Sequence, residues 1–296
     1  MKNSSIFLMA CMTVVLSCSH EIPDGYYVSG LQTIYASLEN DRVTKSSIGN
    51  ESLDVTWSAG DAINVFFGSS ESSRFVTAEA GKIAQFKGSI GVVTGGGEGL
   101  DDETSLWGVY PYDSENVCDG NTVTLRLPFI QQSAENTFAN GLFPVVARSR
   151  NFYMSFYNLC GGLRFSVSSS DIRSVTISGN NGENIAGKVK VSMPLGGVPV
   201  VSEIISGERE LVMNAPDGEC FKPGILYYFI MFPTEFTKGI TVTYHKKDSY
   251  ASYVINRALT LKRSVFNKLP DRDAGLTFIP ETLDGWGPGE TIGGDI

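Results

Sequence analysis

The sequence has few of the side chains on which most catalytic and metal sites depend. Its 296 residues include only two histidines, His20 and His245. In the sequence, neither has the neighbours that a zinc site or a histidine-based catalytic triad needs. Lys and Arg total 23 against 32 for Asp and Glu, which gives a net charge of −9 and no basic cluster to neutralise phosphates. We therefore expect no enzymatic activity, no metal, no cofactor and no nucleic-acid partner.

Cysteines and long apolar runs are also scarce. The chain has 5 cysteines, of which Cys118, Cys160 and Cys220 lie beyond its first 18 residues. Three widely spaced cysteines do not make a complete disulfide framework, although a Cys118–Cys220 bridge stays open. We expect Cys160 to be a small buried apolar residue. After the first segment, no stretch reaches the ~18 apolar residues of a transmembrane helix, so the body of the protein is expected in water.

Residues 1–17 have the features of a lipoprotein signal peptide. A short positive start precedes the apolar run Ile6–Leu16, which is too short to span a bilayer as a helix. The run ends in Val15-Leu16-Ser17-Cys18, which resembles a bacterial lipobox. Cys18 would then carry the lipid and anchor the protein in the outer membrane. The alternative is an ordinary signal peptide in which Cys18 is incidental.

The rest of the chain has the pattern of short strands joined by turns. Val123–Leu127 and Ile240–Tyr244 alternate apolar and polar side chains, as half-buried strands do. Asp119-Gly120-Asn121 and Pro216-Asp217-Gly218 supply turn residues between such segments. Long segments with helical apolar spacing are hard to find. The sequence therefore predicts an all-β fold made of β-sandwiches.

The length predicts two domains, because 296 residues exceed the roughly 100–200 residues of one typical domain. Arg148–Asn151 is a polar break, and Phe152 begins a fresh aromatic-rich strand pair. We therefore expect a signal peptide over residues 1–17, an N-terminal β-sandwich over residues 18–150 and a C-terminal β-sandwich over residues 151–296.

One aromatic motif predicts a local structure in detail. Trp57-x-x-Gly60-Asp61-x-Ile63 is expected to form a strand, a tight turn and a second strand. Gly60 relaxes the backbone at the turn, and the Asp61 carboxylate can accept hydrogen bonds from neighbouring amides. Trp57 is expected in the core of the first domain.

Further motifs follow the Trp57–Ile63 element along the chain, namely Tyr110-Pro111-Tyr112, Gln131-Gln132, Asn158-Leu159-Cys160-Gly161 and Phe232-Pro233. In this order, the motifs resemble those of the fimbrillin-like lipoproteins of Bacteroidales, which are subunits of type V pili. The resemblance extends from Cys18 to the tail that contains Trp286. It implies two successive transthyretin-like, Greek-key β-sandwiches in a non-enzymatic cell-surface lipoprotein that forms fimbriae or caps them as a tip adhesin. Stalk, anchor and tip roles all fit these motifs.

The resemblance also implies how such a subunit assembles with other pilin subunits. The strand-like segment Leu31–Leu38 precedes a polar link that contains Arg42 and Lys45, an accessible protease site. In the family, a protease cuts after a basic residue here and removes the first strand, and a donor strand of another subunit fills the groove. Arg42 is the first candidate for the cut and Lys45 the second. The candidate donor is the tail from Asp284, with anchors Trp286, Ile292 and Ile296.

The sequence leaves open two other hypotheses for the function of the protein and a second possibility for the fate of its first strand. Leu31–Leu38 can stay in place as a permanent edge strand. The protein can be a non-polymerising surface lipoprotein that binds a glycan or a host protein, with exposed aromatics such as Tyr26, Tyr27 or Trp286 as sugar platforms. A hydrolase is the third hypothesis, because the paired carboxylates of glycoside hydrolysis have no recognisable spacing in a sequence.

Overall fold

The computed structural model describes residues 30–39, 55–68, 71–91, 105–216 and 218–281. Within them the regular structure is almost entirely β-strand, with one three-residue 3-10 helix, η2 (Asp273–Gly275), so the all-β prediction is confirmed. No helix in these ranges is long and apolar enough to cross a membrane. Several predicted residues lie outside the described parts, namely Cys18, Tyr26, Tyr27, Arg42, Lys45, Trp286, Ile292 and Ile296.

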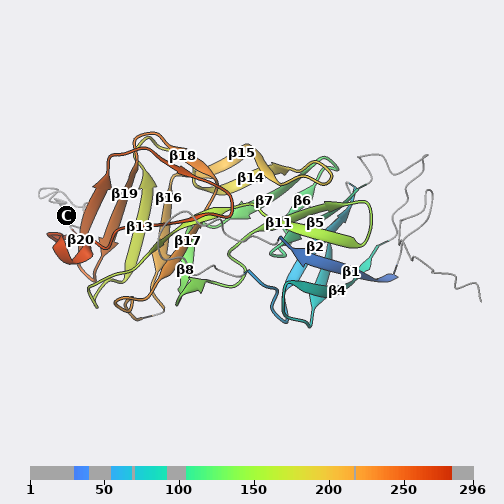
Figure 1. The fold of residues 1–296 in the computed structure, drawn as a ribbon, viewed down its shortest axis with the longest axis horizontal. Helices are drawn as coiled ribbons and strands as arrows, with labels where there is room; N and C mark the ends of the chain where they lie inside the picture. Colours follow the sequence, from blue (N-terminus) through green and yellow to red (C-terminus); the bar gives the residue numbers. More distant parts are fainter. Residues whose placement is uncertain (1–29, 40–54, 69–70, 92–104, 217, 282–296) are drawn as a thin grey trace, which may run out of the picture.

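The first part of the molecule is a closed barrel, which lies around the labels β1, β2, β4 and β5 in Figure 1. Its strands follow the order β1-β11-β10-β5-β2-β3-β4 around the barrel. Their inward side chains alternate with outward ones, and Ile63, Phe75 and Phe86 from three different strands are fully buried. The bounds are β1 (Gly30–Leu38), β2 (Ala62–Phe67), β3 (Ser73–Thr77), β4 (Ile83–Ile90), β5 (Leu106–Tyr110), β10 (Val145–Ser149) and β11 (Tyr153–Asn158).

The remaining strands form open sheets. One sheet has the order β23-β20-β19-β13-β16-β8-β9, and the others are β15-β14-β7-β6, β17-β12-β22 and β18-β21. The bounds are β6 (Val117–Cys118), β7 (Thr122–Leu127), β8 (Ile130–Ala134), β9 (Thr137–Phe138), β12 (Gly161–Phe165), β13 (Ser174–Gly179), β14 (Ala186–Ser192), β15 (Val200–Glu208), β16 (Glu210–Asn214), β17 (Tyr227–Met231), β18 (Thr234–Phe236), β19 (Ile240–His245), β20 (Ser249–Ile255), β21 (Leu259–Leu261), β22 (Phe266–Lys268) and β23 (Ile279–Pro280). The predicted strands at Val123–Leu127 and Ile240–Tyr244 are β7 and β19.

Strand pairing crosses the predicted division at residue 150. After it, β11 belongs to the barrel through its pairing with β10 and β1, whereas β7 and β8, before it, pair with β14 and β16. The polar break at Arg148–Asn151 is the turn between β10 and β11, where the Ser149 hydroxyl donates to the Tyr153 carbonyl at 3.0 Å. A polar turn and a polar linker have the same composition, so the sequence did not distinguish them.

The buried aromatic and cysteine positions agree with expectation. Trp57 is 2% exposed and meets the rings of Phe86, Tyr110 and Phe156 edge-on, which confirms it as a core residue. Cys160 is fully buried, as predicted. The Cys118–Cys220 bridge left open by the sequence is not formed, because Cys118, Cys160 and Cys220 are all free thiols.

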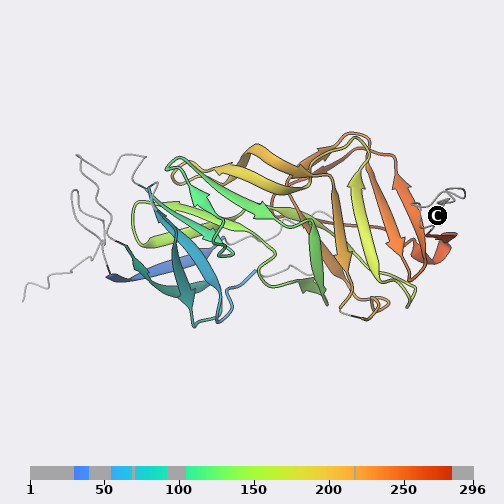
Figure 2. The same cartoon turned by 180° about the vertical axis from the view of Figure 1, so that it is seen from behind.

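The two views of the fold show an elongated molecule (Figures 1 and 2). The barrel with β1 lies at one end of the long axis, and β19 and β20 lie at the other. The last described strand, β23, pairs with β20 and is therefore at that far end too. The first and last strands of the described chain thus mark opposite ends of the molecule.

Candidate functional site: strand β1 and its acidic end

Strand β1 closes the barrel by pairing on both of its edges. It runs antiparallel to β4, from Gly30 opposite Ile90 to Ser37 opposite Ile83, and parallel to β11, with Tyr35 opposite Tyr153. Backbone hydrogen bonds of 2.8 to 2.9 Å hold its second half on both sides, from the Tyr35 N–H to the Phe152 carbonyl and from the Leu38 N–H to the Lys82 carbonyl. Without β1, the edges of β4 and β11 would face each other with unpaired backbone groups.

The inward face of β1 has a simple pattern of large and small side chains. Ile34 and Ala36 are fully buried and Leu38 is nearly so, whereas Leu31 and Tyr35 point outward and are exposed. Full burial of an Ile or Leu side chain contributes roughly 1.5–3 kcal/mol. The strand is therefore held by its inward side chains as well as by two ladders of hydrogen bonds. The sequence predicted this strand, but not which of its residues face the core.

The carboxyl end of β1 is fixed by an ion pair that the sequence analysis missed. Arg263 Nη2 donates to Glu39 Oε1 at 2.7 Å, and Arg263 Nη1 makes a short contact with Glu39 Oε2. The Asn158 backbone N–H also donates to Glu39 Oε2, at 3.1 Å. The two side chains are only 12% (Glu39) and 24% (Arg263) exposed. Arg263 belongs to the link between β21 and β22, outside the barrel.

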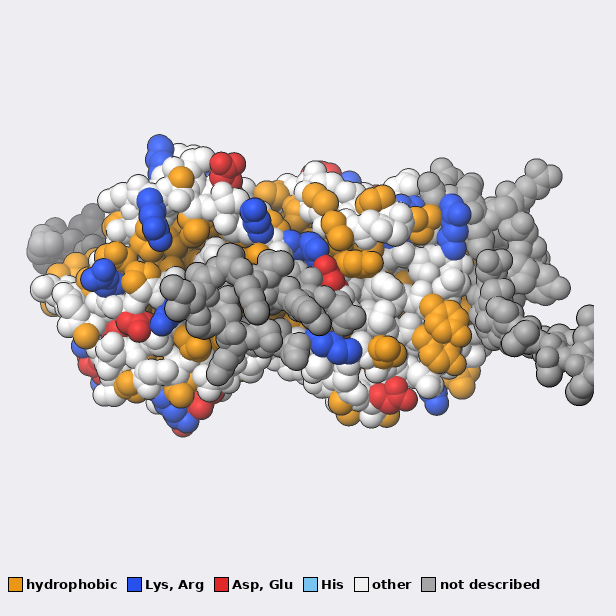
Figure 3. Space-filling model, viewed as in Figure 1, with side chains coloured by type: hydrophobic (Ala, Val, Ile, Leu, Met, Phe, Trp, Pro, Cys, Tyr) orange, Lys and Arg blue, Asp and Glu red, His pale blue; other side chains and the backbone are white. Residues whose placement is uncertain are grey.

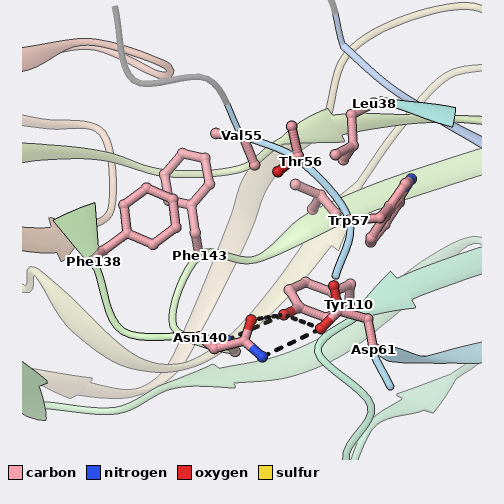
Figure 4. Close-up of a pocket in the computed structure, with 11 residues that line it drawn as sticks. Leu38, Val55, Thr56, Trp57, Asp61, Tyr110, Phe138, Asn140 and Phe143 are labelled. Atoms are coloured by element: carbon pink, nitrogen blue, oxygen red, sulfur yellow. Dashed lines mark hydrogen bonds between the residues drawn. The ribbon is translucent and has the colours of Figure 1, made fainter. Parts of the chain in front are cut away.

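A small cavity of about 40 Å³ lies beside the end of β1 (Figure 4). Leu38 and Trp57 form part of its apolar wall. Its polar side contains Tyr110, whose hydroxyl lies 3.1 Å from Asp61 Oδ1 and 2.9 Å from Asn140 Oδ1. Burial, and then the negative charge of Asp61, raise the pKa of Tyr110 well above its usual range, so the phenol stays protonated.

The turn after Trp57 has the predicted hydrogen bonds. The Ser58 N–H donates to Asp61 Oδ2 at 2.8 Å, and the Asp61 N–H donates back to the Ser58 carbonyl at 3.0 Å. Gly60 has φ of +94°, in the left-handed region that favours glycine. The motif therefore positions Trp57 and Asp61 beside the end of β1, and its role there is structural.

The glutamine pair also has a structural role that the sequence did not reveal. Gln131 is buried, and its amide bridges β8 to the backbone of one residue of β17. Gln131 Nε2 donates to the Ile230 carbonyl at 2.7 Å, and the Ile230 N–H donates to Gln131 Oε1 at 3.0 Å. Gln132 is exposed.

His245 has neighbours that the sequence did not predict. Its Nδ1 lies 2.9 Å from Glu281 Oε1, and its Nε2 lies 3.2 Å from Thr176 Oγ1. The sequence could not show these partners, because the contacts join positions far apart in the chain. Thr176 is itself buried, which closes its hydroxyl to a substrate, and His245 ties Glu281 to the sheet. Across the described ranges, no three His, Cys, Asp or Glu side chains are grouped as for a metal ion.

Two surface features face solvent away from the acidic end of β1. On the barrel, Tyr35 and Tyr153 stack with ring centroids 4.8 Å apart, and both are exposed. Figure 3 shows exposed hydrophobic side chains over both parts of the molecule. A groove of about 780 Å³ lies between the end of β20 and the segment before η2. The aromatic or charged side chains that line it are Tyr253, Arg257, Lys268, Asp271 and Arg272.

Comparison with known proteins finds similarity only among solved structures. No protein-family model matches the chain, and none of the curated proteins matches it either. A proposed cell adhesion protein of Bacteroides uniformis is 15% identical, with a TM-score of 0.47 over 87% of this chain and 97% of that one. A second, of Bacteroides ovatus, is 13% identical, with a TM-score of 0.46 over 88% of this chain and 97% of that one.

A third similar structure is the tip fimbrial protein Mfa3 of Porphyromonas gingivalis with a C-terminal truncation. It is 10% identical, with a TM-score of 0.33 over 81% of this chain and 96% of that one. The first two are described as cell adhesion proteins and the third as a tip fimbrial protein. With identities of 10–15% and TM-scores of 0.33–0.47, the similarity assigns no function to this chain.

Proposed function

We propose that this protein is a structural or adhesive subunit of cell-surface fimbriae and that it assembles by replacement of strand β1. The observation that carries the proposal is the position of β1, which pairs with β4 on one edge and with β11 on the other and thereby closes the barrel. The fimbrillin-like motifs in the sequence support the same role. Residues 40–54, which contain Arg42 and Lys45, connect this strand to Val55.

Cleavage after Arg42 or Lys45 would leave β1 attached only by non-covalent contacts. Its loss would open a groove between β4 and β11, and an extended strand of another subunit would restore both ladders of backbone hydrogen bonds. The tail from Asp284 of a second copy is the proposed donor, with Trp286, Ile292 and Ile296 as its anchors. Because β1 and β23 lie at opposite ends of the molecule, such a contact is head-to-tail and adds subunits along a line.

The same cut would separate the subunit from its membrane anchor. We propose that Cys18 carries the lipid after export and holds the precursor at the outer membrane. Metabolic labelling with palmitate tests this part, and we expect the label to disappear in Cys18→Ala. Label that persists in this variant would show that the lipid is elsewhere.

Limited trypsin treatment of purified precursor tests the assembly. We expect one product that begins at Val43 or Ser46 and that forms a ladder of heat-resistant oligomers on a gel. The Arg42→Ala, Lys45→Ala double variant should give neither the product nor the ladder. Deleting the residues after Asp284 should keep the cleavage and remove the ladder. Cleaved wild-type protein that stays monomeric would contradict the proposed assembly.

The groove at Tyr253 favours glycan capture as a second candidate function. Besides the Tyr253 ring, the groove is lined by three cations, Arg257, Lys268 and Arg272, and by one acid, Asp271. The excess of positive charge suits an acidic sugar, because the cations attract its carboxylate or sulfate and the ring packs against its apolar face. A glycan array tests this function, with the Arg257→Glu, Lys268→Glu variant as the control. Selective binding that the control loses would support it, and binding equal in both proteins would exclude this groove.

A further inference from the structure

We infer that Arg263 and the backbone N–H of Asn158 form a carboxylate-binding site that selects the strand filling the β1 position. The ligand is an extended peptide with the inward pattern of β1, large-x-small-x-large, followed at once by Glu or Asp. In the closed barrel Glu39 occupies this site, directly after the last inward side chain, Leu38. The inference rests on the proposed strand replacement and names the chemistry of the strand that binds most tightly. The tail from Asp284 has no acid directly after such a pattern, so we expect it to bind more weakly than the β1 sequence.

The geometry is that of a dedicated carboxylate site. Both oxygens of Glu39 are engaged by the two terminal nitrogens of one guanidinium, and Oε2 also accepts from a backbone N–H. Such two-pronged pairs of arginine and carboxylate are strong and strict about direction. The site is mostly shielded from water, since the acid is 12% exposed. A charged pair in this setting is screened much less than an exposed one.

The arginine is positioned by contacts that do not involve β1. In its loop, the Ser264 N–H donates to the Cys160 carbonyl at 2.8 Å, and the Gly162 N–H donates to the Val265 carbonyl at 3.0 Å. A Cβ at Gly161 would lie 2.2 Å from the Lys262 carbonyl oxygen, so the loop lies directly against this glycine. We expect the site to keep its shape when β1 leaves, and a preformed site selects its ligand at little ordering cost.

Asn158 joins the two halves of the site. Its N–H contacts the carboxylate, its carbonyl accepts from Arg263 Nη1 at 3.2 Å, and its side-chain amide donates to Ser264 Oγ at 2.9 Å. A strand without the acid would bury this N–H and the guanidinium end without the carboxylate that both now contact. The expected penalty is a loss of affinity of about tenfold or more. The site therefore binds strands that have only the apolar pattern more weakly than strands that also carry the acid.

Peptide binding to the trypsin-treated full chain tests the inference. The probe is a fluorescein-labelled, C-terminally amidated peptide with the sequence of residues 30–40, in which Glu39 is the only acid. A second peptide carries Glu39→Gln. A third carries Ser37→Glu with Glu39→Gln, which keeps the charge but moves it to a position whose side chain lies toward the outside. Fluorescence anisotropy gives the affinity of each peptide.

We expect the first peptide to bind about tenfold or more tightly than either of the others. In the Arg263→Gln protein the affinities of the three peptides should agree within about twofold. Arg263→Lys keeps the positive charge but not the two-pronged geometry of the guanidinium, so its preference for the first peptide should lie between those of the wild type and Arg263→Gln. Equal binding of the three peptides to wild type, or a preference that survives Arg263→Gln, would overturn the inference. If no peptide binds the treated chain, the strand does not exchange and both the inference and the proposed assembly fail. If the treated chain prefers the first peptide but forms no ladder of oligomers on a gel, the carboxylate site is supported and only the proposed polymerisation is contradicted.

Discussion

Strands β1 and β15 have the same length of 9 residues but opposite positions in the fold. β1 lies between two neighbours and buries Ile34 and Ala36 completely. Within the described chain β15 pairs with β14 alone, and its Ile204 is 44% exposed. Removing β1 opens two facing edges and a groove with an apolar floor, whereas removing β15 only moves the edge of a sheet by one strand. A strand suited to exchange is thus an interior strand, because only at an interior position can the incoming strand form backbone hydrogen bonds on both of its edges.

The exposed edge at β15 has features that oppose pairing with another chain. Its register with β14 shifts twice, between Lys188 and Val189 and between Lys190 and Val191. Such bulges bend a strand and break the regular edge that another strand would need. Glu203 places a charge on this edge strand as well, in an ion pair with Lys190 of β14. Bulges therefore protect β15 from pairing with another chain, whereas burial between two neighbours holds β1 in place.

The largest expected effect is at the base of the β1 groove. Trp57→Ala removes a buried ring that contacts three aromatic rings, and we expect a loss of about 3–5 kcal/mol in the free energy of unfolding. Urea denaturation measures it. Trp57→Phe is the matched control: it keeps an aromatic ring, and the Trp57 Nε1–H has no hydrogen-bond partner among the described residues. Equal stability of the Ala variant and the wild type would show that the ring is not part of the core.

A pair of substitutions sharpens the comparison of the two strands. Ile34→Ala in β1 empties a fully buried position and should cost about 2–5 kcal/mol. Ile204→Ala in β15 changes an exposed side chain and should stay within about 0.5 kcal/mol of wild type. Both are measured by urea denaturation of the uncleaved precursor. Similar losses in the two variants would mean that β1 is held no more strongly than an edge strand.

Around β1, the sequence predicted the contacts between residues that are close together in the chain, and it did not predict the contacts between distant residues. The turn at Gly60 and Asp61 was predictable because the residues that make its hydrogen bonds lie within four positions. The pairing of Glu39 with Arg263 was not, because 224 positions separate them and no periodic pattern connects them. The only local signal was the place of Glu39 directly after an alternating apolar strand. Which strands border β1 was equally hidden, since one neighbour, β11, lies beyond the polar turn that the sequence presented as a domain boundary.

A smaller effect is expected where Gln131 of β8 contacts the backbone of β17, both in the open sheets outside the barrel. Gln131→Ala leaves both backbone groups of Ile230 without their partner and should cost about 1–3 kcal/mol. Gln132→Ala, at the adjacent exposed position, is the matched control and should be near neutral. Thermal unfolding compares the two. A larger loss for Gln132 would indicate that the exposed glutamine carries the link.

The smallest effect concerns alkaline pH and the sheet next to the barrel. Burial is the main cause that raises the pKa of Cys118 to about 11 from its usual 9.0. Because the folded-state pKa is the higher one, the contribution to stability is complete below pH 9 and falls as the pH rises toward 11. Between pH 8 and pH 9.5, the contribution of the Cys118 thiol to the free energy of unfolding should fall by about 1 kcal/mol. Urea denaturation of wild type and Cys118→Ala at both pH values isolates it, since buried Tyr110 and Tyr244 titrate in both proteins. An identical pH dependence in the two proteins would show that Cys118 reaches solvent as easily as a thiol in the unfolded chain.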